Sequence, residues 1–258
     1  MLQNDLQAAT GLRISTQTIR NRLHQAGLHA RIPVIRIPPN HHQCQGRLNW
    51  ARQNRRWTAT QWCHIVFSNE SRFFWDFNDG RQWVWRHHLE RFADCTAAEH
   101  DRCGGASLMV WAAIWTGGRA DLHLFRMGTV NGQRYLDEVI RSLEIPLIRQ
   151  LGDEFIFMHD NAPCHRAITV SRELDVNNIM RLPWPAHSPE LNPIEHAWYM
   201  LGRTIHNMPD QPQTLDALEN ALTAQWMTIP QNDLNRLIAS VRLRVQMCIV
   251  AAGGDTHS

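Results

Sequence analysis

The run Phe155-Ile156-Phe157-Met158 constrains the fold more than any other stretch, because all four side chains are apolar. A strand that is apolar at successive positions is covered on both faces, as in the sheets of α/β proteins. Asp160 follows this strand, and α/β folds place their ligands at the carboxyl ends of strands. Burying an acid without a partner is costly, so we expect a metal ion or a hydrogen-bonding network there. The alternative is a turn-forming Asp in Asp-Asn-Ala-Pro.

The order of the other segments predicts an α/β fold in which a mixed sheet is flanked by helices. Alternating and apolar runs predict an antiparallel meander, with a turn at 78–80. Helices and strands then alternate to the end of the chain. The predicted strands are 61–69, 72–77, 82–86, 107–115 and 121–125, then the strand ending at Asp160 and a short one at 179–182. The predicted helices are 132–151, 165–175, one beginning near Glu195, 213–227 and 231–248.

A second acid, Glu195, follows Asp160 after 34 intervening residues (161–194) and lies at the start of a predicted helix. It stands about 100° round the helix from Ile194, at the edge of an apolar stripe, where it is able to reach a site beside the core. The alternative is a capping box, in which Asn192 caps the helix, Pro193 takes its first position and Glu195 stands three residues after the cap.

The front of the chain is basic and is predicted to bind DNA. Residues 1–60 hold nine Arg and one acid, a net charge of +8, whereas the remainder carries −6. A predicted helix at 2–9, a turn, and a helix from Thr16 to about Ala26, capped by Ser15 and stopped by Gly27, are typical of a helix-turn-helix. An ordinary amphipathic helix pair is the alternative. The proline-rich linker 31–42 is expected to be extended, and a basic helix is predicted at 43–56. The predicted DNA-contacting residues are Arg13, Ser15, Thr16, Gln17, Arg20, Arg22, Arg31 and Arg36.

Composition argues against two other classes of protein. No apolar run approaches the roughly 20 residues that span a bilayer, and no basic-then-apolar leader opens the chain. The six cysteines form no Cys-x-x-Cys pair, so we expect reduced thiols of an intracellular protein. Hydrophobic content of 43% with 11 Trp indicates a globular protein.

Five blocks of residues, in order along the chain, resemble the transposases of the Tc/mariner superfamily, in the branch with 34 residues between the second and third acids. The blocks are Phe67-Ser68-Asn69-Glu70-Ser71-Arg72-Phe73, Asp79-Gly80-Arg81-x-x-Val84-Trp85-Arg86, Val110-Trp111-Ala112, His159-Asp160-Asn161-Ala162-Pro163-x-His165 and Trp184-Pro185-x-x-Ser188-Pro189-x-Leu191-Asn192-Pro193-Ile194-Glu195-x-x-Trp198. The resemblance runs from about residue 10 to about residue 245.

The resemblance implies a ribonuclease-H-like catalytic domain behind paired helix-turn-helix modules. It implies cut-and-paste movement of DNA between terminal inverted repeats into TA targets, by a homodimer in the nucleus, although no nuclear-localisation cluster stands out. Catalysis is expected to use Mg²⁺, with Mn²⁺ as a substitute, held by a triad at Asn69, Asp160 and Glu195. The expected domains are a partial helix-turn-helix (1–30), a basic linker and helix (31–60) and the catalytic domain (61–250).

The sequence departs from the family pattern in two places. The family motif reads Ser-Asp-Glu-Ser-Arg, and here Asn69 replaces its Asp, which removes one negative charge from a site for cations. Glu70 is not expected to substitute, because adjacent strand residues point to opposite faces, and Asp76 and Asp79 lie too far along. Compared with the family pattern, the front is also expected to lack the first helix-turn-helix and the opening helix of the second.

Three functional interpretations remain open at this stage. In the first, the chain is a transposase whose metal binding and strand cleavage are severely impaired by Asn69. In the second, the enzyme is active despite Asn69. In the third, the chain is a non-catalytic DNA-binding or dimerising protein derived from a transposase.

Overall fold

The computed structural model describes residues 15–31, 34–35, 39–74, 84–86, 97–98, 107–126 and 128–256. The chain divides into two compact units. Unit 1 combines Met1–Ile37 with Asn78–Gly104, and unit 2 combines Pro38–Phe77 with Gly105–Ser258. The predicted helix at 2–9 and the predicted turn at 78–80 lie outside the described residues.

Unit 1 contains the helix that the sequence predicts at the front of the chain. Helix α2 (Thr16–Gln25) begins after Ser15, whose hydroxyl accepts a hydrogen bond from the Thr18 amide at 3.1 Å. It is followed by Gly27 in a left-handed conformation, with φ of 75°. Two short strand pairs complete the described part. Strand β1 (His29–Arg31) runs antiparallel to β4 (Val84–Arg86), and β2 (Val34–Ile35) runs parallel to β5 (Ala97–Ala98).

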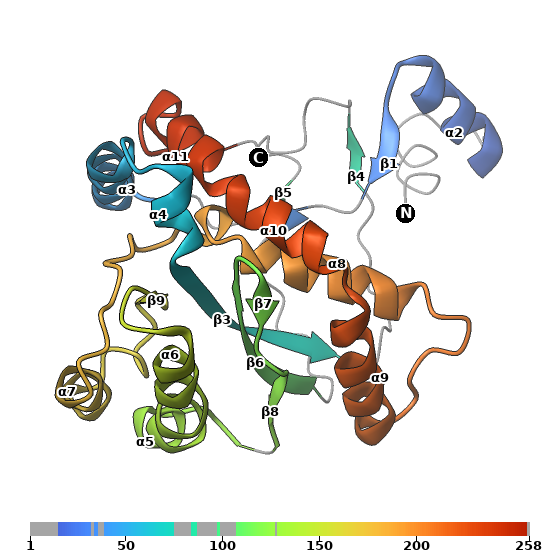
Figure 1. The fold of residues 1–258 in the computed structure, drawn as a ribbon. Helices are drawn as coiled ribbons and strands as arrows, with labels where there is room; N and C mark the ends of the chain where they lie inside the picture. The colour runs from blue at the N-terminus through green and yellow to red at the C-terminus, as the bar shows by residue number, and fades with distance from the viewer. Residues whose placement is uncertain are drawn as a thin grey trace. The chain divides into compact units, whose positions relative to one another are not determined.

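Unit 2 is built on one mixed sheet with the order β7-β6-β3-β9, in which β8 also pairs with β6 (Figure 1). Strand β3 (Ile65–Phe74) lies antiparallel to β6 (Ser107–Trp115) over eight residue pairs, and β7 (Gly118–Arg119) and β8 (His123–Phe125) are both antiparallel to β6. On its other side, β3 is parallel to β9 (Ile156–Met158). The sheet is therefore mixed, as predicted.

Each face of the sheet is covered by a hydrophobic core, because successive side chains alternate in direction. Ile65, Phe67 and Met158 belong to one core, and Val66 and Phe157 belong to the other. The first core also takes residues from α3 (His41–Asn54), α4 (Ala59–Cys63), α8 (Ile194–His206), α9 (Leu215–Thr228), α10 (Gln231–Ala239) and α11 (Val241–Val250). The second takes residues from α5 (Gly132–Tyr135), the π-helical segment η2 (Leu136–Glu144), α6 (Ile145–Leu151) and α7 (Ile168–Val176). The apolar strand 155–158 is thus covered on both faces.

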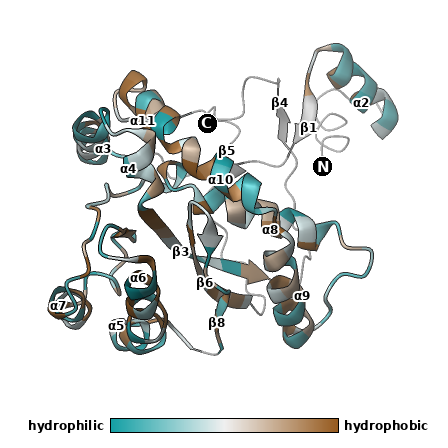
Figure 2. Cartoon of the chain, in the orientation of Figure 1, coloured by the Kyte–Doolittle hydropathy of each residue, from teal (hydrophilic) through white to brown (hydrophobic). Residues whose placement is uncertain are grey.

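The helices of unit 2 carry hydrophilic and hydrophobic positions along their length, as expected of helices with one buried face (Figure 2). Within the described residues, no helix is long and apolar enough to cross a membrane.

Several predicted elements differ from the structure. Residues 61–63 are helical rather than strand, because Thr58 and Gln61 form a capping box that starts α4. The predicted strands 61–69 and 72–77 are replaced by β3, continuous from Ile65 to Phe74. The predicted strand 82–86 is observed as β4, but it pairs with β1 in unit 1 and is not part of the meander.

The final predicted helix, 231–248, divides at Ser240 into α10 and α11. The predicted strand at 179–182 is reduced to one parallel bridge between Phe157 and Arg181. The basic helix predicted at 43–56 is observed as α3, which begins two residues earlier at His41.

Candidate active site

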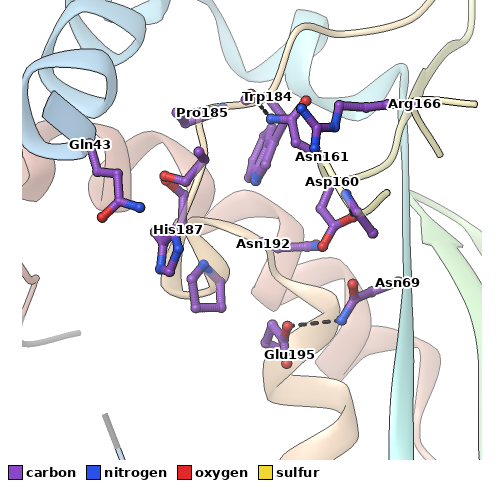
Figure 3. A pocket seen from close by; sticks show the side chains of 14 residues that line it. Gln43, Asn69, Asp160, Asn161, Arg166, Trp184, Pro185, His187, Asn192 and Glu195 are labelled. Carbon is purple, nitrogen blue, oxygen red and sulfur yellow. Dashed lines mark hydrogen bonds between the residues drawn. The ribbon is translucent and has the colours of Figure 1, made fainter. Parts of the chain in front are cut away.

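The three positions of the predicted triad line one cavity of about 560 Å³ in unit 2 (Figure 3). Asn69 is the fifth residue of β3, Asp160 lies two residues beyond β9, and Glu195 is the second residue of α8. Strands β3 and β9 are parallel with Phe67 opposite Met158, so Asn69 and Asp160, each two residues further along, come to the same level of the sheet. The sheet and α8 therefore bring together side chains that are far apart in sequence.

Glu195 faces the cavity rather than its own helix. Its Oε1 accepts a hydrogen bond from Asn69 Nδ2 at 2.8 Å (Figure 3). The Asn192 part of the capping-box alternative is observed, because Asn192 Oδ1 accepts a hydrogen bond from the Ile194 amide at 3.3 Å. The reciprocal part is not formed, because the Asn192 amide donates to the Pro189 carbonyl at 2.9 Å and Glu195 turns to Asn69. Asn192 also donates a hydrogen bond to the Ser68 carbonyl at 3.2 Å, which ties the start of α8 to β3.

The electrostatics of Glu195 favour the protonated carboxyl. Burial raises its pKa to about 7, the charge of Asp160 adds to the rise, and the hydrogen bond from Asn69 opposes it. Two carboxylates that share a cavity repel each other, and a cation between them relieves that repulsion.

Asp160 is held by its own turn and by a histidine. Its Oδ1 accepts a hydrogen bond from the Ala162 amide at 2.8 Å and lies 2.7 Å from His165 Nδ1. Burial opposes ionisation, but the hydrogen bond and the charge of His165 prevail and lower the pKa of Asp160. The turn-forming role is thus confirmed, and it is compatible with a place in the cavity.

The cavity supplies oxygen ligands of the kind that Mg²⁺ and Mn²⁺ take. The two carboxylates of Asp160 and Glu195 fit such an ion. The third position fits less well, because the amide of Asn69 is neutral and its Nδ2 donates to Glu195 Oε1 and to the Glu70 carbonyl. Among the residues that the structure describes, no group of three His, Cys, Asp or Glu side chains is placed to hold a metal ion.

The structure adds two residues to the site that the sequence reasoning did not assign to it. Glu70 does not line the cavity, in agreement with strand alternation, but its Oε1 lies 3.3 Å from His165 Nε2. His165 therefore contacts Glu70 and Asp160 together. Burial alone lowers the pKa of His165, but the charge of Glu70 and the hydrogen bond to Asp160 outweigh it and raise that pKa. Both residues lie in the sequence blocks that resemble the transposase family, and this position in the blocks was the signal for a role in the site. Asp76 and Asp79 lie outside the described residues.

The predicted DNA-contacting residues are found, as far as they are described, in unit 1. Ser15 caps α2, and Thr16, Gln17, Arg20 and Arg22 are exposed on that helix. Arg13 and Arg36 lie outside the described residues, and Arg31 is described only by its backbone in β1. The described part of this prediction is thus confined to exposed positions of α2 and its N-cap.

Comparison with known families gives two matches along the chain. Residues 64–219 match a family described as DDE superfamily endonuclease, and residues 1–56 match a transposase family with a helix-turn-helix of the Tc3 type. The chain is 32% identical to the transposase of the transposable element Tc1 of Caenorhabditis elegans over 246 residues, which cover 94% of this chain and 88% of that protein. It is 28% identical to the Tc3 transposase of the same organism, over 99% of this chain and 75% of that protein.

The fold is also similar to solved structures of the mariner transposase Mos1, from Drosophila mauritiana. The Mos1 paired-end complex with the left transposon end matches with a TM-score of 0.67 at 21% identity, over 96% of this chain and 74% of that one. The Mos1 catalytic domain with raltegravir and Mg matches with a TM-score of 0.60, over 83% and 97%. The sheet with its flanking helices is thus ribonuclease-H-like. Taken together, the matches show that the chain belongs to the Tc1/mariner family of DDE transposases, with an N-terminal helix-turn-helix region of the Tc3 type.

Proposed function

We propose that this transposase binds the terminal inverted repeats of its element as double-stranded DNA and that Asn69 weakens its strand cleavage. We further propose that it acts in the nucleus as a homodimer, moving DNA into TA targets. The observation that carries the catalytic part is the cavity, in which Asn69, Asp160 and Glu195 meet and Asn69 donates a hydrogen bond to Glu195. The relatives support the DNA part, because Mos1 is known in complexes with transposon ends.

The weakening follows from charge and from hydrogen bonding. An Asp at position 69 offers two charged oxygens, whereas Asn69 offers one neutral oxygen and two donor hydrogens. The donor amide occupies Glu195 Oε1, an oxygen that a metal ion needs as a ligand. A bound cation therefore has one carboxylate ligand fewer. It must also displace the hydrogen bond from Asn69 in order to bind Glu195 Oε1.

Mg²⁺ is the proposed cofactor, with Mn²⁺ as a substitute, and Asp160, Glu195 and the weaker position 69 are its proposed ligands. Mos1 structures contain Mg in one case and Mn in another. When bound, such ions activate the attacking oxygen and stabilise the leaving oxygen of a phosphodiester. The contribution of this chain is to fix the direction of its two carboxylates. Asn192 does so by tying α8 to β3, and the Ala162 amide does so by donating a hydrogen bond to Asp160.

The decisive experiment restores the missing charge. We expect Asn69→Asp to raise Mg²⁺- or Mn²⁺-dependent cleavage of repeat-containing DNA by about 100-fold or more, since a metal site is worth several kcal/mol of transition-state stabilisation and about 1.4 kcal/mol corresponds to a factor of ten. Cleavage is measured as strand nicking over time at matched DNA occupancy.

Asn161→Asp is the matched control for that experiment. It adds the same charge to the wall of the same cavity, but Asn161 binds the Trp184 carbonyl at 2.6 Å and is not in the triad. We expect no gain from it. If the unmodified chain cleaves as fast as Asn69→Asp, the proposed impairment is wrong. If Asn161→Asp raises the cleavage rate as much as Asn69→Asp does, the added charge is responsible and its position is not.

The Asn69–Glu195 hydrogen bond also favours a second function, a DNA-binding or dimerising protein without catalysis. This bond gives Glu195 a partner in the absence of a cation. A chain of this kind binds repeat-containing DNA in EDTA as tightly as in Mg²⁺ and inhibits an active transposase on the same ends. Failure to bind such DNA under either condition contradicts both functions.

A further inference from the structure

His165 and Glu70 lie behind the cavity and take no part in the function proposed above. The imidazole of His165 stands between two carboxylates, with Nδ1 2.7 Å from Asp160 Oδ1 and Nε2 3.3 Å from Glu70 Oε1. Its side chain is 1% exposed, so water does not compete for these contacts. The imidazole therefore links β3 to the segment that carries Asp160.

The imidazole is held in place by its neighbours as well as by the acids. The ring of Tyr135 packs against it with centroids 4.3 Å apart, and the ring of His159 lies edge-on at 5.0 Å. Tyr135 is itself fully buried and donates a hydrogen bond to Glu144 at 3.2 Å. A ring packed in this way has little freedom to turn, so the direction of its two nitrogens is set by the core.

His165 Nδ1 lies 2.7 Å from Oδ1 and 3.2 Å from the main-chain carbonyl oxygen of Asp160, and it contacts one oxygen of the carboxylate. Both the Ala162 amide and His165 Nδ1 meet Oδ1, and in the described part of the chain Oδ2 forms no hydrogen bond or ion pair. A carboxylate held by one oxygen has a fixed plane, and its other oxygen remains available to the cavity. Partners of this kind behind a metal ligand orient it and raise its affinity for the ion.

Strand alternation explains why Glu70 belongs to the same arrangement. Asn69 and Glu70 are neighbours on β3 and point to opposite faces. Asn69 reaches Glu195 directly, whereas Glu70 reaches Asp160 through His165. The two residues are thus connected to the two acids of the cavity from the two faces of one strand, Asn69 directly and Glu70 through His165.

We propose that His165 is a positioning residue that fixes the Asp160 carboxylate through Nδ1 and is itself anchored by Glu70, so that Asp160 presents its free oxygen to a divalent cation. The inference rests on the proposed role of Asp160 as a metal ligand. It assigns functions to Glu70 and His165 that are separate from the charge lost at position 69.

The test uses two substitutions, each of which keeps an N–H group near the position of one of the two ring nitrogens. In the full-length chain carrying Asn69→Asp, His165→Asn places an amide N–H near the position of Nδ1, and His165→Gln places one near the position of Nε2. Mn²⁺ affinity is measured by isothermal titration, and folding is monitored by the thermal unfolding midpoint. We expect His165→Gln to weaken Mn²⁺ binding about 10- to 100-fold and His165→Asn to stay within about threefold of the parent.

Two further variants complete the design. Glu70→Gln leaves His165 in place and removes its charged anchor, so a smaller fall of about threefold is expected. His123→Gln is the matched control, because His123 Nε2 forms a similar contact with Glu138 at 3.0 Å on β8, outside the cavity. We expect its Mn²⁺ affinity to equal that of the parent.

The outcomes separate this inference from the proposed function. Equal Mn²⁺ affinity in His165→Gln and the control overturns the positioning role, and so does an equal loss in His165→Asn and His165→Gln. If Glu70→Gln binds Mn²⁺ like the control, the anchoring role of Glu70 is wrong. If neither the unmodified chain nor Asn69→Asp binds Mn²⁺, the proposed metal site fails, and the positioning role fails with it.

Discussion

Helices α2 and α3 both come from the basic front of the chain, yet they use their arginines in opposite ways. Helix α2 buries no residue, and Arg20 and Arg22 are exposed on it. Helix α3 buries Arg47 completely, and the guanidinium donates to the carbonyls of His187 at 2.6 Å and Gly253 at 2.7 Å. The net charge of a segment therefore shows neither which arginines are available to DNA nor which hold the fold together.

Arg47 joins three parts of unit 2. Besides these two carbonyls, it bonds the Ser188 hydroxyl at 3.1 Å, the Gly254 carbonyl at 3.0 Å and the carboxylate of Glu190. His187 and Ser188 line the cavity that contains the acids. A helix expected to be part of a linker is thus packed into the catalytic unit and supports the wall of its site.

The largest effect is expected from Arg47→Met, which removes a buried charge with several acceptors. We expect unfolding of the full chain in urea to show a loss of about 3–5 kcal/mol, since removing one partner leaves a buried charge and carbonyls unpaired. Arg52→Met, at an exposed position of the same helix, is the control and should stay within about 0.5 kcal/mol. Equal effects of the two substitutions would remove the contrast between buried and exposed arginines.

The carboxylate of Glu195 is buried without the several hydrogen-bond partners that Arg47 has. We therefore expect a neutral side chain at this position to stabilise the folded chain. Its pKa is raised from 4.5 to about 7 by burial and by Asp160. Between pH 4.5 and about pH 7, the folded chain holds a proton on Glu195 that the unfolded chain releases. The free energy of unfolding therefore falls as the pH rises through this range.

In EDTA, Glu195→Gln should therefore gain about 1–3 kcal/mol at pH 8, and less at pH 5.5. Urea unfolding at the two pH values measures the difference. The control is Glu173→Gln, because the hydrogen bond from Arg141 lowers the pKa of Glu173 and no gain is expected there. A gain for Glu195→Gln that is the same at both pH values would argue against titration as its cause.

A smaller effect is expected at the helix caps, and here the two units should differ. Ser15→Ala removes the cap of α2 and Thr58→Ala removes the cap of α4, each at a cost of about 1 kcal/mol. Because α2 buries no residue, we expect the loss at Ser15 to appear as faster hydrogen exchange of the Thr18 and Ile19 amides without a change in global unfolding. The loss at Thr58 should appear in global unfolding of unit 2. If Ser15→Ala lowers the free energy of global unfolding, α2 unfolds together with the hydrophobic core.

The smallest effect on stability is expected from Arg20→Ala and Arg22→Ala, within about 0.5 kcal/mol. Their effect should appear instead in DNA binding, measured by fluorescence anisotropy at several salt concentrations. Each arginine that contacts a phosphate should reduce the slope of log affinity against log salt by about one. Arg236→Ala, at an exposed position in α10, is the control and should leave the slope unchanged. An unchanged slope in all three variants contradicts DNA contact by α2.

Much of the catalytic unit could be predicted from its sequence, because the signals are local. The apolar strand before Asp160, strand β6 and the long helix from Gly132 to Leu151 follow from hydrophobic periodicity. The helix at residues 59–63 was missed because a short apolar run does not distinguish helix from strand, and the Thr58–Gln61 cap decided it. The partner of β4 was missed because strand pairing is non-local, and a strand pattern does not say which strand lies beside it.

The sequence by itself determined the ancestry of this chain and predicted three positions that line one cavity, since blocks of residues at fixed spacing carry that information. It also determined that position 69 holds an amide. Only the tertiary structure decided what the side chains do. The local sequence favoured a helix cap for Glu195, whereas the approach of α8 to β3 brings it to Asn69. Likewise, Glu70 and Asp160 are 90 residues apart, and packing in the core places His165 between them.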